Sequence, residues 1–219
     1  MKIVGIIPVK SVSTRIPDKN FMCLNDGKPL FKRAYSKLSN IKLIDKVYID
    51  TDDPDKVREF APEIPSQNIL HRPKELSLSS ANGHNIMKWA GSQVEGDIIV
   101  QHLCTAPFVS STSIMAAIMH VLGGHDTCFT GTKVIQYAWD SKGNALYDYK
   151  KLPNSQELEY TIIETMGLYV VKRSYLEKTG LRTKENSGIV FVSGFEAFDI
   201  NYPADLEAAK VLKRVKEKW

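Results

Sequence analysis

Three basic and three hydroxyl-bearing residues stand close together directly after a short apolar run near the start of the chain. The basic residues are Lys10, Arg15 and Lys19, and the hydroxyl-bearing ones are Ser11, Ser13 and Thr14. A loop of this composition can present backbone N–H groups and charged side chains to a polyphosphate. A solvated loop with scattered basic side chains is an equally open interpretation, since the chain has neither a GxGxxG nor a GxxxxGK[ST] pattern.

The elements that must position this loop follow an alternating pattern. Short β-branched runs predict strands at 3–7, 47–49, 68–71, 97–100, 127–134, 167–171 and 189–192, and longer patterns predict helices at 29–38, from 54, at 82–94, at 110–122 and from 203. This order is typical of βαβ units and predicts an α/β fold with a single doubly wound, mostly parallel sheet. Ligands of such sheets bind beyond the carboxyl ends of the strands, where the loop after the first strand begins.

One segment, at about 135–163, breaks this alternation. It is rich in Tyr, Lys, Asn and Gly and has no sustained period. We expect an arm inserted into one domain that spans residues 1–219. Its aromatic residues could form a hairpin or a dimer contact.

Composition narrows the class of protein. The net charge of +4 is mild and dispersed, which argues against nucleic-acid binding. No stretch approaches the ~20 apolar residues of a membrane helix. The three cysteines are widely spaced without a CxxC pair, so neither a disulfide framework nor a cysteine zinc site is expected. A reducing, cytoplasmic compartment fits this pattern.

Several short motifs follow one another along nearly the whole chain. They are S-T-R-I-P-D-K-N at 13–20, G-K-P-L at 27–30, V-Y-I-D-T-D-D at 47–53, R-P-K-E-L at 72–76, T-A-P-F at 105–108, G-L-Y at 167–169 and F-D-I-N-Y-P-A-D-L at 198–206. The ordered set resembles the CMP-sugar synthetases, the family of acylneuraminate, Kdo and pseudaminate cytidylyltransferases. The resemblance implies a Rossmann-like nucleotidyltransferase fold. For the arm it adds the alternative of an acceptor-pocket wall that a second subunit completes.

The resemblance also implies a reaction and a site. The reaction would be Mg²⁺-dependent transfer of CMP from CTP to an acidic 2-keto-3-deoxy sugar, with release of pyrophosphate, in a homodimer. Nucleotide binding would fall to Lys10, Ser11, Ser13, Thr14, Arg15, Lys19, Asn20 and Arg72, with Lys19 and Arg15 catalytic, and the metal would be held by Asp199 and Asn201. The chemistry agrees: attack at the α-phosphorus builds charge that cations offset, and magnesium takes one or two protein carboxylates besides phosphate oxygens and water.

Departures from the family pattern leave alternatives open. Lys10, Val12, Leu103 and Asn201 each differ from the usual residue, which keeps open a phosphonate or sugar phosphate as acceptor, or a non-catalytic nucleotide-binding relative. Asn201 could ligate the metal or only cap the helix that starts near Pro203. The DxD at 50–52 is also found in metal sites of glycosyltransferases, but helix capping and the family motif explain it better.

Overall fold

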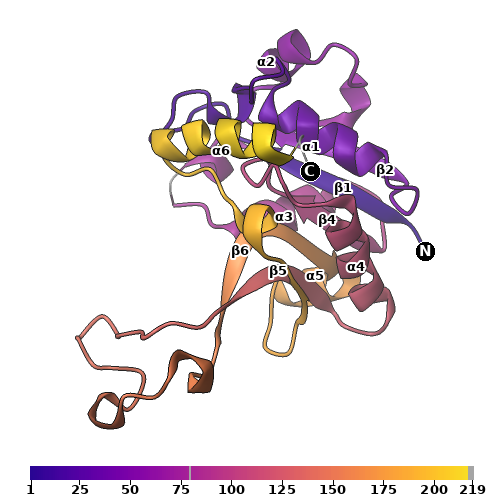
Figure 1. Ribbon diagram of the computed structural model, residues 1–219. Helices are drawn as coiled ribbons and strands as arrows, with labels where there is room; N and C mark the ends of the chain where they lie inside the picture. The colour runs from indigo at the N-terminus through magenta and orange to yellow at the C-terminus, as the bar shows by residue number, and fades with distance from the viewer. Residues whose placement is uncertain (79, 217–219) are drawn as a thin grey trace.

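The computed structural model describes residues 1–78 and 80–216 and forms one seven-stranded sheet covered by helices (Figure 1). The strands are β1 (Ile3–Val9), β2 (Lys46–Thr51), β3 (Ile69–His71), β4 (Ile98–His102), β5 (Thr127–Val134), β6 (Thr161–Lys172) and β7 (Gly188–Phe191). The helices are α1 (Leu30–Ser39), α2 (Pro54–Phe60), α3 (Gly83–Ser92), α4 (Ser111–Leu122), α5 (Arg173–Thr179) and α6 (Pro203–Lys216). The predicted α/β fold is confirmed.

The strand order is β3-β2-β1-β4-β6-β5-β7. β6 runs antiparallel to both of its neighbours, and all other pairs are parallel. The carboxyl ends of the six other strands therefore lie at one edge of the sheet, together with the amino end of β6. We call this edge the binding edge, because ligands of open α/β sheets bind there.

Alternating side chains of β1 face two different helix layers. Ile3, Ile7 and Val9 belong to a core shared with α1, α4 and α6, whereas Val4 and Ile6 pack with residues of α3 and α5. Figure 1 shows α1, α4 and α6 on the near face of the sheet. This period of two, buried on both sides, is what a central parallel strand requires.

Short polar residues start the helices where the sequence predicts. The Asp53 carboxylate accepts a hydrogen bond from the backbone N–H of Lys56, with Pro54 in the first turn of α2. Asn82 and Asn85 form a capping box at α3, and Ser110 caps α4. α5 was not predicted, since its seven residues lie directly after the long strand β6.

The segment at 135–163, predicted as an inserted arm, lies between β5 and β6. β5 and β6 pair out to Val134 and Thr161, so residues 161–163 belong to β6 and the loop between the strands covers 135–160. The arm projects away from the sheet and its helices (Figure 1). Because β5 ends and β6 begins at the binding edge, the arm leaves the body on the side where a ligand is expected.

In the part of the chain that the structure describes, no helix is long and apolar enough to span a bilayer.

Candidate active site

The loop after β1 is anchored at both ends by its own polar residues. Both the backbone N–H and the hydroxyl of Ser11 donate to the Asp52 carboxylate, at 2.7 and 2.8 Å. The amide of Asn20 donates to the carbonyl oxygen of Lys10 at 2.9 Å. The loop is thus closed into one unit of residues 10–20, which we call the cationic loop.

The two predicted catalytic residues lie at the end of this loop nearest α6. The Lys19 ammonium donates to the carbonyl oxygen of Ile200 at 2.8 Å. The Arg15 guanidinium lies 5.4 Å from the centre of the Tyr202 ring, a cation–π contact. Burial, with Arg15 as a further cause, lowers the pKa of Lys19, while Asp199 opposes this shift. The structure therefore brings Lys19 and Arg15 to the segment that carries the predicted metal ligands.

That segment holds a buried carboxylate oxygen to which no described residue donates. The Asn201 amide donates to Oδ2 of Asp199 at 2.7 Å, while Oδ1 of Asp199 accepts no hydrogen bond from residues 1–78 or 80–216. A buried unpaired carboxylate oxygen is costly unless a cation or donor reaches it. Oxygen ligation is what Mg²⁺ prefers, and one protein carboxylate beside phosphate oxygens is a usual set. Asp199 thus fits the predicted metal.

Asn201 and Asp205 divide the polar contacts before α6. The Oδ2 atom of Asp205, in the first turn of α6, accepts from the backbone N–H groups of Asn201 and Tyr202, each at 2.8 Å. The side-chain amide of Asn201 donates to Asp199 and fixes the orientation of that carboxylate. Within the described ranges no group of three or more His, Cys, Asp or Glu residues could hold a metal.

The remaining nucleotide-loop residues occupy different environments. The Ser13 hydroxyl accepts a long hydrogen bond from the backbone N–H of Ile16, at 3.5 Å, which stabilises the turn. Thr14 is exposed, and Lys10 is half-buried at the end of β1. Their roles in phosphate binding stay predictions.

Arg72 is placed differently from the other basic residues. Its side chain is only 2% exposed, and its Nε and Nη2 atoms donate to the fully buried carboxylate of Asp50 at 2.8 and 2.6 Å. Its backbone N–H donates to the carbonyl oxygen of Thr51 at 2.7 Å. Through these bonds Arg72 joins the ends of β2 and β3. A direct contact between Arg72 and the nucleotide stays a prediction. Both acids of the DxD at 50–52 therefore have partners within the protein: Asp50 pairs with Arg72, and Asp52 accepts hydrogen bonds from Ser11 of the cationic loop.

A cavity of about 240 Å³ adjoins the cationic loop on the α3 side of the sheet. Pro8, Gly83, Leu103, Thr105, Met166 and Arg182 are among its lining residues. Cys104, also in its wall, donates from Sγ to Oδ1 of Asn20 at 3.2 Å, and the Thr105 carbonyl accepts from the backbone N–H of Ile200 at 2.9 Å. The cationic loop, the Asp199 segment and this cavity are therefore neighbours. Sequence reasoning missed Gly83 and Arg182, because neither belongs to a motif.

The sequence profile of a family described as cytidylyltransferase matches residues 4–212. The chain belongs to the cytidylyltransferase family. A 3-deoxy-manno-octulosonate cytidylyltransferase of Geobacter metallireducens is 25% identical and is aligned over 98% of both chains. An 8-amino-3,8-dideoxy-manno-octulosonate cytidylyltransferase of Shewanella woodyi is also 25% identical, over 80% of this chain and 77% of its own length.

Solved structures agree with this cytidylyltransferase fold. The CMP:2-keto-3-deoxy-manno-octonic acid synthetase complexed with CTP superposes with a TM-score of 0.74 at 16% identity, over 99% of this chain and 100% of that one. The 4-diphosphocytidyl-2C-methyl-D-erythritol synthase of Anaerococcus prevotii has a TM-score of 0.70 at 15% identity, over 97% and 96%. At these low sequence identities the two structures show that this cytidylyltransferase shares their fold, including the sheet that carries its cationic loop.

Proposed function

We propose that this cytidylyltransferase moves CMP from CTP to an acidic 2-keto-3-deoxy sugar and releases pyrophosphate, with Mg²⁺ bound at Asp199. The observation that carries the proposal is the meeting of the cationic loop with the Asp199 segment, through the hydrogen bond from Lys19 to Ile200. Support for the acceptor class comes from the relatives named for 3-deoxy-manno-octulosonate and its 8-amino counterpart.

In the proposed reaction, basic residues of the site bind the phosphates and one acidic residue binds the metal. Lys10, Arg15 and Lys19 offset the negative charge of the triphosphate and of the departing pyrophosphate. Ser11 and Asn20 keep the loop closed, so the cations hold their positions before the nucleotide arrives. When bound, Mg²⁺ would supply Lewis-acid stabilisation of charge on phosphate and acceptor oxygens. Asp199 is the carboxylate available for it, and Asn201 orients that carboxylate.

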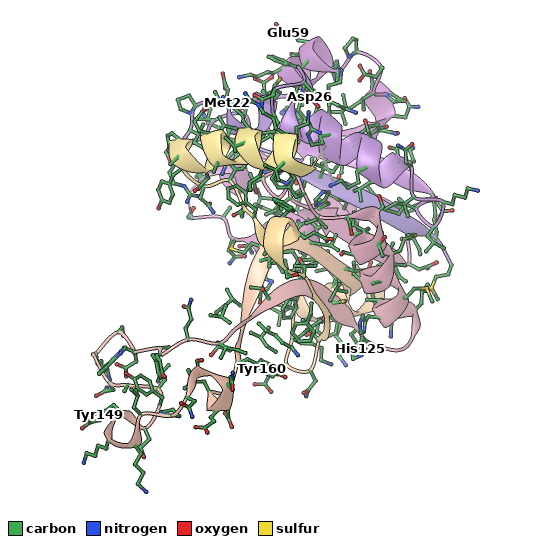
Figure 2. The ribbon with its side chains drawn as sticks, viewed as in Figure 1. Met22, Asp26, Glu59, His125, Tyr149 and Tyr160 are labelled. Carbon is green, nitrogen blue, oxygen red and sulfur yellow. The ribbon has the colours of Figure 1, made fainter. Side chains whose placement is uncertain are left out.

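We further propose that the protein acts as a homodimer held by the arm. The arm exposes a run of large apolar side chains, among them Ile135, Trp139, Leu146, Tyr149, Leu152 and Tyr160. In Figure 2, Tyr149 lies at the far end of the arm and Tyr160 nearer the body. Exposed apolar surface of this extent is typical of interaction sites. Since the arm leaves from the binding edge, a partner's arm could also reach the acceptor.

Pyrophosphate release tests the reaction directly. The purified chain is incubated with Mg²⁺, with each of the four nucleoside triphosphates in turn, and with a panel of acidic sugars and phosphonates. Release that requires CTP and an acidic sugar supports the proposal. Release only with a phosphonate would replace the acceptor class, and CTP binding in a thermal shift without release from any acceptor would contradict catalysis.

A further inference from the structure

Arg182 is a half-buried cation in the wall of the cavity beside the cationic loop. It lies in the loop between α5 and β7, where its guanidinium stacks 3.7 Å from the centre of the Tyr169 ring. Its Nη1 donates to Oε1 of Gln101, a side chain of β4 that is 1% exposed, at 2.9 Å. Burial lowers the pKa of Arg182, which means that its charged form is disfavoured where it stands.

No carboxylate of the described residues forms an ion pair with this guanidinium. The charge of Glu164 acts on Arg182, but the Glu164 carboxylate accepts a hydrogen bond from the Tyr169 hydroxyl at 2.8 Å. A charge that is partly withdrawn from water is favoured by an opposite charge, and this guanidinium has room for one on its cavity side. The cavity beside Arg182 is where such a ligand would bind.

The backbone around Arg182 makes room for it. A Cβ atom added at Gly83 would overlap Nη1 of Arg182, so the guanidinium occupies the space that the side chain of any other residue would fill. The backbone N–H of Arg182 donates to Nδ1 of His84 at 3.1 Å, which ties the Arg182 loop to the start of α3. The Arg182 guanidinium is thus held at one place in the cavity wall by its contacts with Gln101, Gly83 and His84.

We propose that Arg182 binds the carboxylate of the acceptor, with Gln101 and Gly83 holding its guanidinium in position. This inference rests on the proposed function, and it assigns the acceptor side of the site to a residue outside every family motif in the chain. A planar guanidinium matches a planar carboxylate in two parallel hydrogen bonds, which a lysine could not provide. The cavity adjoins Asn20 and Ile200 through Cys104 and Thr105, so an acid held at Arg182 stands next to the nucleotide loop.

Two variants separate the charge of Arg182 from its position. Arg182→Gln removes the charge, whereas Gly83→Ala keeps it but forces the guanidinium aside, and alanine suits a helix. Lys184→Gln is the matched control, since Lys184 stands on the same loop but pairs with Asp126. The measurements are the KM values for CTP and acceptor, and calorimetric binding of 3-deoxy-manno-octulosonate, N-acetylneuraminate and their methyl esters.

We expect the wild type to bind an acid but not its ester, and Arg182→Gln to raise the acceptor KM about tenfold or more, as for loss of a charge-assisted hydrogen bond. Gly83→Ala should also raise the acceptor KM, but by less. The KM for CTP should stay unchanged in both variants. In Lys184→Gln, both KM values should stay unchanged.

Other outcomes separate this inference from the proposed function. If CMP is transferred but the acceptor KM does not respond to Arg182→Gln, or if the KM for CTP responds instead, the inference is overturned and the reaction stands. The inference is also overturned if neither acid binds the wild type. If an acid binds through Arg182 without any pyrophosphate release, the inference holds and the transfer proposal fails.

Discussion

The Nζ atom of Lys19 lies 2.8 Å from the carbonyl oxygen of Ile200, which joins two segments 181 residues apart in the sequence. One segment carries the cations of the cationic loop, and the other carries the carboxylate of Asp199. This hydrogen bond holds the Lys19 ammonium close to Asp199, the proposed metal ligand, so that both can act on the same phosphate group.

Replacing Lys19 by alanine should lower turnover by roughly 100- to 1000-fold, the size expected when a key donor to a charged transition state is lost. Pyrophosphate release under saturating CTP and acceptor measures it. Lys42→Ala is the control, because Lys42 is an exposed lysine outside the site. Unchanged turnover in Lys19→Ala would remove Lys19 from the mechanism.

Asp199→Asn should abolish magnesium-stimulated activity while the fold stays intact. The asparagine oxygen can still accept from the Asn201 amide, so the loss is one of charge rather than of the hydrogen bond at 2.7 Å. The magnesium dependence of pyrophosphate release gives the result, and Asp126→Asn, at a surface ion pair, controls for loss of a carboxylate. Wild-type magnesium dependence in Asp199→Asn would mean that the metal binds elsewhere.

Arg72→Met should lower the free energy of unfolding by about 3–5 kcal/mol, because it leaves the buried carboxylate of Asp50 without its partner. Urea unfolding measures the change. Arg58→Met, which breaks an exposed pair with Asp55, should cost less than about 1 kcal/mol. Adding Asp50→Asn to Arg72→Met should recover part of the loss. If instead Arg72→Met keeps full stability and loses CTP affinity, Arg72 serves the nucleotide.

His102 should make the protein sensitive to acid. It is fully buried, and burial lowers its pKa from 6.5 to about 3, with Lys37 contributing and the hydrogen bond between its Nδ1 and the Gly167 carbonyl opposing the shift. Because the folded-state pKa is below the unfolded one, the unfolded state binds the proton first. Stability is therefore complete above pH 6.5 and declines as the pH falls toward 3, by up to roughly 4 kcal/mol.

Urea unfolding between about pH 7 and pH 4 checks this dependence. His102→Asn keeps a donor for the Gly167 carbonyl but cannot take up a proton, so the variant should lose stability less steeply than the wild type. His71→Asn, at an exposed histidine, should follow the wild-type curve. Parallel curves for His102→Asn and the wild type would contradict the assignment.

The arm should control the oligomeric state. Replacing both Trp139 and Tyr149, which are 55% and 61% exposed, by serine removes two large apolar side chains from the proposed contact. We expect the dimer to dissociate in light scattering, with activity toward the acceptor reduced and CTP binding kept. Leu43→Ser, at an exposed residue outside the arm, should leave the mass unchanged. A monomeric wild type would refute the dimer.

Local patterns were enough to predict most strands and helices, because burial on both faces, caps and turns are properties of short segments. The strand at 127–134 and the cap at Asp53 illustrate this. β6 was predicted only from 167 onwards, since its first part runs into the arm with exposed side chains and is held by pairing with β5. That pairing is a long-range property that no local pattern carries.

The sequence by itself determined the α/β class, the arm, the cationic loop after β1 and the candidate ligand Asp199, because each depends on residue type and spacing in a short segment. Only the tertiary structure decided how these parts are used. It paired Arg72 with Asp50 inside the protein, buried one oxygen of Asp199 without a donor among the described residues, and placed Arg182 beside Gln101 and Gly83. Burial and partners set the chemistry of a charged side chain, and both arise only when distant segments pack together.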